Sequence, residues 1–244
     1  MNPRGFVLHY GPSAINGRPV VAIMTTTTSN AKTGPMPQVW FLYGDEEPHV
    51  ARRNGNDVAI CGGCPHRAGS CYVVLHRGPL AVYRAWVAGR YGTAEEALRW
   101  LDYHRPRYVR VGAYGDPMSA PLVLGQLARA VEPHGGRLLG YTHQWRRPYA
   151  HAYQSWLMAS VDTPAEALRA RSKGWRTFRV RLEGEPLDPT EVLCAAERER
   201  SNCSACGACD GASARPSIVA TVHGLAHVQK KFIAHRATQA GGAA

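Results

Sequence analysis

The stretch YVRVG at residues 108–112 is followed by a helical pattern over residues 121–131 and by a second apolar run, RLLGY, at residues 137–141. Short β-branched and aromatic runs that alternate with helical segments are typical of βαβ units, which place their strands in a mostly parallel sheet. The same alternation continues toward both ends of the chain, so the sequence predicts an α/β fold.

Further strands are predicted from apolar runs at residues 19–24, 39–43, 58–60, 156–161, 177–182 and 218–222. A helix is predicted over residues 79–104, with a break at Tyr91 and Gly92, and another begins after Thr163. Counted from residues 58–60, about six strands alternate with helices, which is fewer than a closed eight-stranded barrel needs. We therefore expect about six β/α units in a partial, open TIM-like barrel with a C-terminal cysteine-rich loop; a doubly wound sheet is the alternative.

The predicted organisation has three regions. Residues 1–57 hold N-terminal strands and a loop, and residues 58–225 form the partial barrel, which includes a cysteine-rich insert at residues 194–210. Residues 226–244 are basic and rich in Ala and Gly, so we expect this tail to be disordered.

Composition restricts the classes of partner. The net charge is +11, from 29 Lys and Arg against 18 Asp and Glu, which suits nucleic acid or another anionic partner. The basic residues are scattered, however, so they are equally consistent with a solvated surface. No apolar run approaches the length of a membrane span, and the first residues lack the features of a signal peptide. We expect a cytoplasmic protein without a membrane partner, in which clustered cysteines indicate metal or catalysis rather than disulfides.

Four of the seven cysteines form a group near the C-terminus. Cys203, Cys206 and Cys209 make a C-x2-C-x2-C run, and Cys194 lies upstream of it. Three evenly spaced thiolates with a distant fourth are typical of ferredoxin-type iron–sulfur sites, whereas zinc more often takes paired C-x2-C motifs. The spacing favours an iron–sulfur cluster and leaves zinc or unliganded redox thiols as alternatives.

The other three cysteines, Cys61, Cys64 and Cys71, have the spacing C-x2-C-x6-C and no obvious fourth cysteine. A zinc ion would recruit His66 and form a closed structural loop, whereas a [4Fe–4S] cluster would keep one iron free for a non-protein ligand. An open coordination position is what catalysis needs, so any catalysis is expected at this group.

Unusual residues follow successive predicted strands. Cys61 follows the first strand of the barrel, Gly115-Asp116-Pro117 the second, Thr142-His143-Gln144-Trp145 the third and Asp162 the fourth. The segment from Cys194 to Cys209 lies between the fifth strand and the sixth. Ligands gather at the carboxyl ends of parallel strands, so we expect these residues to form one site.

A cysteine triad after one strand, the segment Tyr114-Gly115-Asp116-Pro117 after the next, and a partial barrel resemble the radical SAM enzymes. The resemblance implies that Cys61, Cys64 and Cys71 hold a [4Fe–4S] cluster that binds S-adenosylmethionine. It implies that the segment 114–117 faces the amino group of the methionine moiety, and that His143 and Gln144 touch substrate or the adenosyl group. The family spacing is commonly C-x3-C-x2-C with Glu in the second motif, and this chain differs at both points.

The same resemblance implies a second, auxiliary cluster at Cys194, Cys203, Cys206 and Cys209, and an electron donor such as flavodoxin or ferredoxin. A narrower likeness is to uncharacterised phage-encoded proteins. Those proteins share the N-x-K-x-G pattern, here NAKTG at residues 30–34, and a cysteine loop that ends in Cys71-Tyr72. This second likeness implies no activity.

The function predicted is an iron–sulfur, radical SAM-like enzyme that acts on a small-molecule, nucleotide or nucleic-acid substrate. The alternative is a non-catalytic, zinc-stabilised nucleic-acid-binding protein of phage origin. The residues leave open whether the chain is an enzyme.

Overall fold

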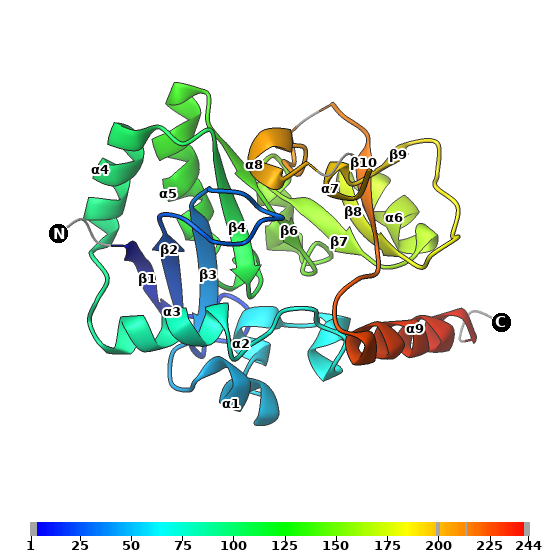
Figure 1. The fold of residues 1–244 in the computed structure, drawn as a ribbon, viewed down its shortest axis with the longest axis horizontal. Helices are drawn as coiled ribbons and strands as arrows, with labels where there is room; N and C mark the ends of the chain where they lie inside the picture. The colour runs from blue at the N-terminus through cyan, green and yellow to red at the C-terminus, as the bar shows by residue number, and fades with distance from the viewer. Residues whose placement is uncertain (1–3, 199–200, 213, 242–244) are drawn as a thin grey trace.

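The first sheet combines an antiparallel meander with parallel strands. The computed structural model describes residues 4–198, 201–212 and 214–241, which form a mixed α/β fold with two five-stranded sheets (Figure 1). The strands of the first sheet, in spatial order, are β1 (Gly5–Pro12), β2 (Pro19–Thr25), β3 (Gln38–Tyr43), β4 (Tyr108–Tyr114) and β5 (Arg137–Leu139). β1, β2 and β3 pair antiparallel, whereas β3, β4 and β5 pair parallel. β2 lies between β1 and β3, and its residues from Val20 to Met24 are fully buried.

The second sheet is parallel throughout. Its strands, in spatial order, are β6 (Tyr141–Thr142), β7 (Met158–Val161), β8 (Thr177–Arg181), β10 (Ser217–Thr221) and β9 (Glu191–Leu193). Only Gly140 separates β5 from β6, so one extended segment pairs with β4 in its first half and with β7 in its second. A Cβ atom at Gly140 would lie 2.6 Å from the carbonyl oxygen of Val111, so this junction requires glycine.

Helices connect the parallel strands. The α-helices are α1 (Pro48–Arg53), α2 (Val58–Cys61), α3 (Gly78–Val87), α4 (Ala94–His104), α5 (Leu122–Val131), α6 (Pro164–Arg171), α7 (Ala195–Arg198), α8 (Cys203–Cys206) and α9 (Ala226–Gly241). Short 3-10 turns are η1 (Pro65–Ala68), η2 (Pro117–Ser119), η3 (Glu132–His134) and η4 (Pro148–Tyr153). Thr93 and Thr163 cap α4 and α6 by accepting hydrogen bonds from Glu96 and Glu166 amides, as the sequence predicts. None of the described helices is long and apolar enough to cross a lipid bilayer.

Two sequence predictions are wrong at the level of secondary structure. Residues 58–60, predicted as a strand, belong to helix α2, and the parallel series therefore begins at β3. A run of three apolar residues has no measurable period, so it does not distinguish a buried helical turn from a strand. Residues 226–241, predicted to be disordered, form helix α9, whose buried Val228 and Phe232 lie one turn apart on one face. The remaining tail, residues 242–244, lies outside the described residues.

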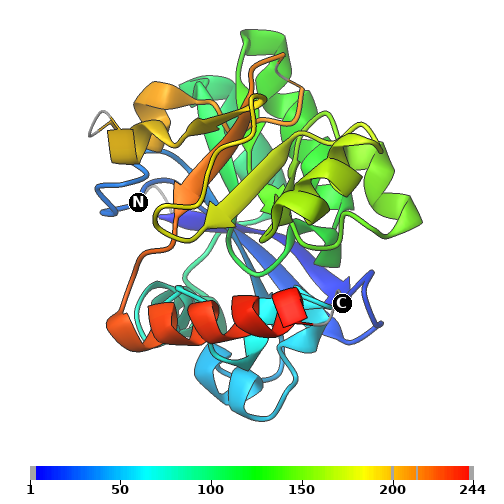
Figure 2. The same ribbon diagram turned by 90° about the vertical axis from the view of Figure 1, so that its right-hand side faces the viewer.

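The arrangement places different segments at the two ends of β4. Figure 1 shows α2 beyond the arrowheads of β3 and β4, and α8 near the opposite end of β4. Figure 2 shows α9 passing below the second sheet, beside the segment that carries the first three cysteines. Contacts confirm this placement, because the ring of Phe232 in α9 stacks on His66 with centroids 5.4 Å apart.

Candidate metal centres

The turn after β4 joins two strand ends to the first cysteine segment. The buried carboxylate of Asp116 accepts hydrogen bonds at 2.7–3.0 Å from the amides of Met118 and His143 and from the hydroxyl of Thr142. The amide of Asp116 donates to the carbonyl of Ile60 at 2.6 Å. This one residue therefore holds the end of β6 and the residue before the first cysteine in fixed positions.

The rest of the predicted segment 114–117 is packed around this turn. Gly115 has a φ of 75°, and a Cβ atom there would overlap the carbonyl of Phe41, so both the conformation and the space require glycine. Pro117 is buried at the start of η2, and Tyr114 is 5% exposed. Burial raises the pKa of Tyr114, and the charge of the Cys61 thiolate raises it further, so the phenol lies within electrostatic range of the first cysteine group.

Gln144 fixes the backbone that carries the first cysteine. Its side-chain amide donates to the carbonyl of Cys61 at 2.9 Å, and its oxygen accepts from the amide of Gly63 at 3.5 Å and from Arg147 at 3.1 Å. Gly62 adopts a φ of 52°, and a Cβ atom there would collide with the Gln144 side chain. The structure therefore confirms that the residues after β4 and β6 meet the first cysteine segment, as their positions at strand ends predict.

The three residues of the first group are half-buried, and their thiols interact electrostatically with one another. Burial raises the pKa of Cys61, Cys64 and Cys71, and the neighbouring thiolates raise the pKa of Cys61 and Cys64 further. Backbone amides act in the opposite direction, since the amide of His66 donates to the Cys64 sulfur and that of Val73 to the Cys71 sulfur. Amide donors favour the thiolate form, which is the form that binds metal.

His66 is held away from the role of a zinc ligand. One ring nitrogen, Nδ1, lies 2.8 Å from the hydroxyl of Ser70, and the other, Nε2, lies 3.0 Å from the carboxylate of Asp162 after β7. Both nitrogens are therefore occupied in a buried environment. A closed zinc loop with three cysteines and His66 would require one ring nitrogen of His66 to release its present partner, Ser70 or Asp162.

His143 borders the same region. Its ring lies 5.5 Å from that of His66 in a T-shaped arrangement, and its buried Nε2 atom has no hydrogen-bond partner among the described residues. Burial lowers the pKa of His143 to about 4, and the nearby His66 lowers it too, so the ring is neutral at pH 7. A neutral, buried imidazole with an unsatisfied nitrogen is suited to contact a ligand at this end of β6.

The second cysteine group is held by backbone hydrogen bonds from three distant segments. The amide of Cys194 donates to Val219 at 2.7 Å, that of Cys203 to Lys32 at 3.0 Å, and the carbonyl of Cys209 accepts from Gly140 at 3.1 Å. Burial raises the pKa of Cys209 to about 12, and the thiolates of the other three cysteines raise it as well. Burial also raises the pKa of Cys194, although the amide of Ala196 donates to its sulfur.

Arg176 fixes the loop that follows this group. Its guanidinium donates to the carbonyls of Ala208 at 3.0 Å, Arg215 at 3.1 Å and Pro216 at 2.7 Å, and it also contacts Asp210. One buried cation thus determines the path of the chain from the last cysteine to β10, and no pattern within the loop itself predicts that path.

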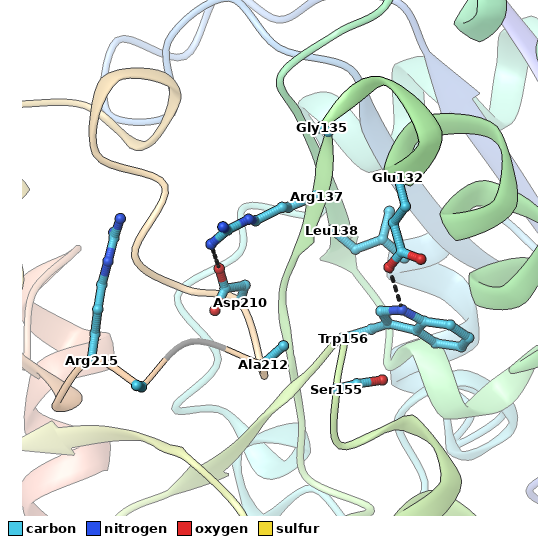
Figure 3. A pocket seen from close by; sticks show the side chains of 11 residues that line it. Glu132, Gly135, Arg137, Leu138, Ser155, Trp156, Asp210, Ala212 and Arg215 are labelled. Carbon is cyan, nitrogen blue, oxygen red and sulfur yellow. Dashed lines mark hydrogen bonds and ion pairs between the residues drawn. The ribbon is translucent and has the colours of Figure 1, made fainter.

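A cavity of about 790 Å³ lies on the outer side of this loop, where β5 and β7 begin (Figure 3). Arg137 binds Asp210 across it at 2.9 Å, and Trp156 donates to Glu132 at 2.7 Å. These charged and polar groups are already paired with each other, and the cavity lies at the strand starts rather than at the strand ends that carry the first cysteine group.

One face of β4 connects the two cysteine groups. Tyr108, at the start of the strand, packs with Cys203 and Cys209, whereas Tyr114, at its end, interacts with Cys61. Alternate residues of a strand share a face, and six residues span about 20 Å. The second group packs at the start of β4 and the first interacts with its end, while Tyr72, which follows Cys71, interacts electrostatically with Cys203. That all the unusual residues form one site stays a prediction.

Comparison of the chain with protein-family models, with curated proteins and with solved structures gives no match in any of the three. Within residues 4–198, 201–212 and 214–241, no three His, Cys, Asp or Glu side chains are gathered as they would be around a single metal ion. The donor sets suit metal, since each group offers three or more thiols with amide donors to their sulfurs, but the thiols would have to turn toward a common centre.

The sequence analysis missed Arg110 as a member of these regions, whereas it placed Asp162, which follows the fourth predicted strand, among the site residues. Arg110 is 8% exposed in the middle of β4 and interacts electrostatically with Cys203, and Asp162 is the partner of His66. A single arginine inside the apolar run YVRVG is the signal that could have identified the first, because a buried charge needs a compensating partner.

Proposed function

We propose that this chain is an iron–sulfur protein with radical SAM-like chemistry. Cys61, Cys64 and Cys71 would hold a [4Fe–4S] cluster with one open coordination position. The observation that carries this proposal is the pairing of His66 with Asp162 and Ser70, because it leaves the group with three thiols beside the strand ends. Such a set suits an open cluster better than a closed zinc site.

The arrangement of the sheets supports a partial, open TIM-like barrel. The strands from β3 to β8 follow one another in sequence order, pair parallel, and continue from the first sheet to the second through Gly140. In barrels of this kind the reacting groups come from the loops after the strands. The first cysteine group, Asp116 and His143 all occupy such loops, so this end of the barrel is proposed as the active site.

The residues around the first group have separate tasks in this proposal. When bound, the cluster would supply the electron for reductive cleavage of S-adenosylmethionine. Asp116 keeps the turn after β4 and the start of the next loop in place, so that the backbone of residues 114–117 can bind the amino group of the cofactor. Gln144 fixes the backbone of Cys61 and keeps the first thiol in position. His143 offers a neutral ring with one unsatisfied nitrogen to the cofactor or the substrate.

Cys194, Cys203, Cys206 and Cys209 would hold a second, closed centre that uses all four thiols. Support comes from their mutual electrostatic interaction and from the three backbone anchors of the segment. A closed centre leaves no position for substrate, so its role is electron transfer or support of the fold, with flavodoxin or ferredoxin as the class of donor.

Metal analysis of protein purified without oxygen tests the proposal. We expect about eight irons per chain, and about four after either the Cys64→Ser or the Cys206→Ser substitution. Protein reduced with dithionite should release 5′-deoxyadenosine from S-adenosylmethionine, and Cys64→Ser should abolish this release while Cys206→Ser keeps the first cluster. Zinc in place of iron at both groups would contradict the proposal and favour a zinc-stabilised nucleic-acid-binding protein, which the charge of +11 also suits.

A further inference from the structure

Arg110 differs from the other deeply buried arginine of the structure. Arg179, which is fully buried, binds the carboxylates of Glu191 at 2.6 Å and Glu185 at 3.1 Å. Arg110 is 8% exposed, yet no carboxylate lies within ion-pair distance of it in the described part of the chain. Burying a guanidinium without an anionic partner is costly, so a second charge is expected beside it.

The groups that contact Arg110 orient its side chain but do not neutralise it. Its guanidinium donates to the phenol oxygen of Tyr141 at 3.1 Å and lies 5.3 Å from the centre of the same ring. The phenol of Tyr72 also interacts electrostatically with it. The ring of Tyr141 is itself held by stacking on Phe178, with centroids 4.2 Å apart. Neutral phenols therefore aim the cation and leave its charge uncompensated.

The residues near Arg110 identify the anion that is expected beside it. Tyr108 precedes it by two residues on the same face of β4 and packs against Cys203 and Cys209. Arg110 interacts electrostatically with Cys203 and with Cys209. Four thiolates around Zn²⁺, or around a [4Fe–4S]²⁺ cluster, carry a net charge of about −2. A loaded centre would supply the negative charge that the described residues lack.

We propose that Arg110 is the counter-cation of the metal–thiolate centre at Cys194, Cys203, Cys206 and Cys209, and that it strengthens metal binding there and raises the reduction potential of the centre. This inference rests on the second centre of the proposed function. Arg110 is a positioning residue, since it acts through the charge of the thiolates. A nearby cation favours the more reduced, more negative state of a cluster, so its removal makes the potential more negative.

Arg110→Met tests this directly, with Arg107→Gln as the matched control. Arg107 is an exposed arginine three residues before Arg110, and its guanidinium lies 5.0 Å from the centre of the Tyr108 ring. In competition with a chelator, Zn²⁺ binding to the second group is expected to weaken about tenfold or more in Arg110→Met and to stay unchanged in Arg107→Gln. In iron-loaded protein, the midpoint potential of the second centre should become more negative in Arg110→Met alone.

The Tm of the metal-free protein provides a second test, because there the substitution of Arg110 is expected to have the opposite effect. Without metal, Arg110 is an uncompensated buried charge, so Arg110→Met is expected to raise the Tm of the metal-free chain and to lower that of the metal-loaded chain. If Arg110 had only a structural role, its replacement would lower the Tm of both forms. If Arg110→Met fails to fold, Arg110→Gln gives the same two comparisons with a polar side chain.

The outcomes separate this inference from the proposed function. If Cys203→Ser lowers the metal content and Arg110→Met binds metal with wild-type affinity and potential, the role of Arg110 is overturned and the second centre stands. If Cys203→Ser has the same metal content as wild-type protein, the second centre is absent, and both the second centre and the role of Arg110 are overturned.

Discussion

His66 and Asp162 are 96 residues apart in the chain, yet the Nε2 atom of the imidazole lies 3.0 Å from the carboxylate. This contact joins the first cysteine loop to the end of β7. Asp162→Ala leaves the buried imidazole without its partner, so we expect the free energy of unfolding to fall by about 2 kcal/mol, measured by urea denaturation. Asp102→Ala removes the exposed Asp102–His134 pair, also at 3.0 Å, and should change the free energy of unfolding by less than about 0.5 kcal/mol. Equal effects of the two variants would contradict a supporting role for the buried pair.

The same contact predicts a loss of stability in acid. Burial alone would raise the pKa of Asp162, but the hydrogen bond and charge of His66 hold it below its ordinary value of 3.8. A carboxylate whose pKa is lower in the folded state stabilises the protein above pH 3.8, and this contribution is lost as the pH falls through the lowered value. Acid unfolding followed by circular dichroism should therefore be steeper in wild-type protein than in Asp162→Asn. Parallel acid transitions in the two proteins would refute this assignment.

Asp116 predicts a pH dependence of the opposite sign. Burial raises its pKa from 3.8 to about 6, although hydrogen bonds from four residues, Met118, Thr142, His143 and Gln144, act to lower it. The folded state therefore binds the proton more tightly, and stability falls as the pH rises from about 4 through 6. Relative to Asp116→Asn, the unfolding free energy of wild-type protein should decrease by about 3 kcal/mol between pH 4 and pH 7, measured by denaturation of metal-free protein. A constant difference between the two proteins over this range would show that Asp116 keeps its ordinary pKa.

Gly207 predicts a specific requirement for glycine between two cysteines of the second group. Its φ is 60°, and a Cβ atom there would overlap the ring of Tyr108. Gly184 has a φ of 76° and open space around it, so Gly184→Ala carries the backbone penalty alone, about 1 kcal/mol. Gly207→Ala should cost more than this in thermal unfolding and should also reduce the metal content of the second group. Similar Tm values for the two variants would mean that the Tyr108 ring moves away freely.

Elements with a clear period were predictable from the sequence. The strand, helix and strand over residues 108–141 appear as β4, α5 and β5–β6. Thr93 and Thr163 cap α4 and α6, as the glutamate three residues after each of them indicates. Residues 58–60 were not predictable as a helix, because distant contacts support their conformation: Asp116 donates to the carbonyl of Ile60 and Ser13 to that of Ala59.

The two cysteine groups differ in how far the sequence could place them. The residues after β4 and β6 meet because the ends of parallel strands meet, and that rule needs only the order of the elements. The first group follows helix α2 and joins these residues through the hydrogen bonds from Gln144 to Cys61 and from Asp116 to Ile60, which no local pattern predicts. The position of the second group depends on the backbone of Lys32 and Gly140 and on the side chain of Arg176. The contact from Arg176 to Ala208 already joins residues 32 positions apart. Such contacts are absent from any local pattern, so neither that position nor the partnership of Arg110 with Cys203 was predictable.

The shared face of β4 also constrains how the chain can change over evolution. Tyr108 and Arg110 lie two residues apart on one face, so inserting or deleting a single residue between them would turn one of the two to the opposite face. Between Val111 and Tyr114 the register with β3 shifts and Gly112 has a φ of 78°, so this part of the strand already departs from strict alternation. A change in length is therefore expected to be tolerated less between Tyr108 and Arg110 than between Val111 and Tyr114.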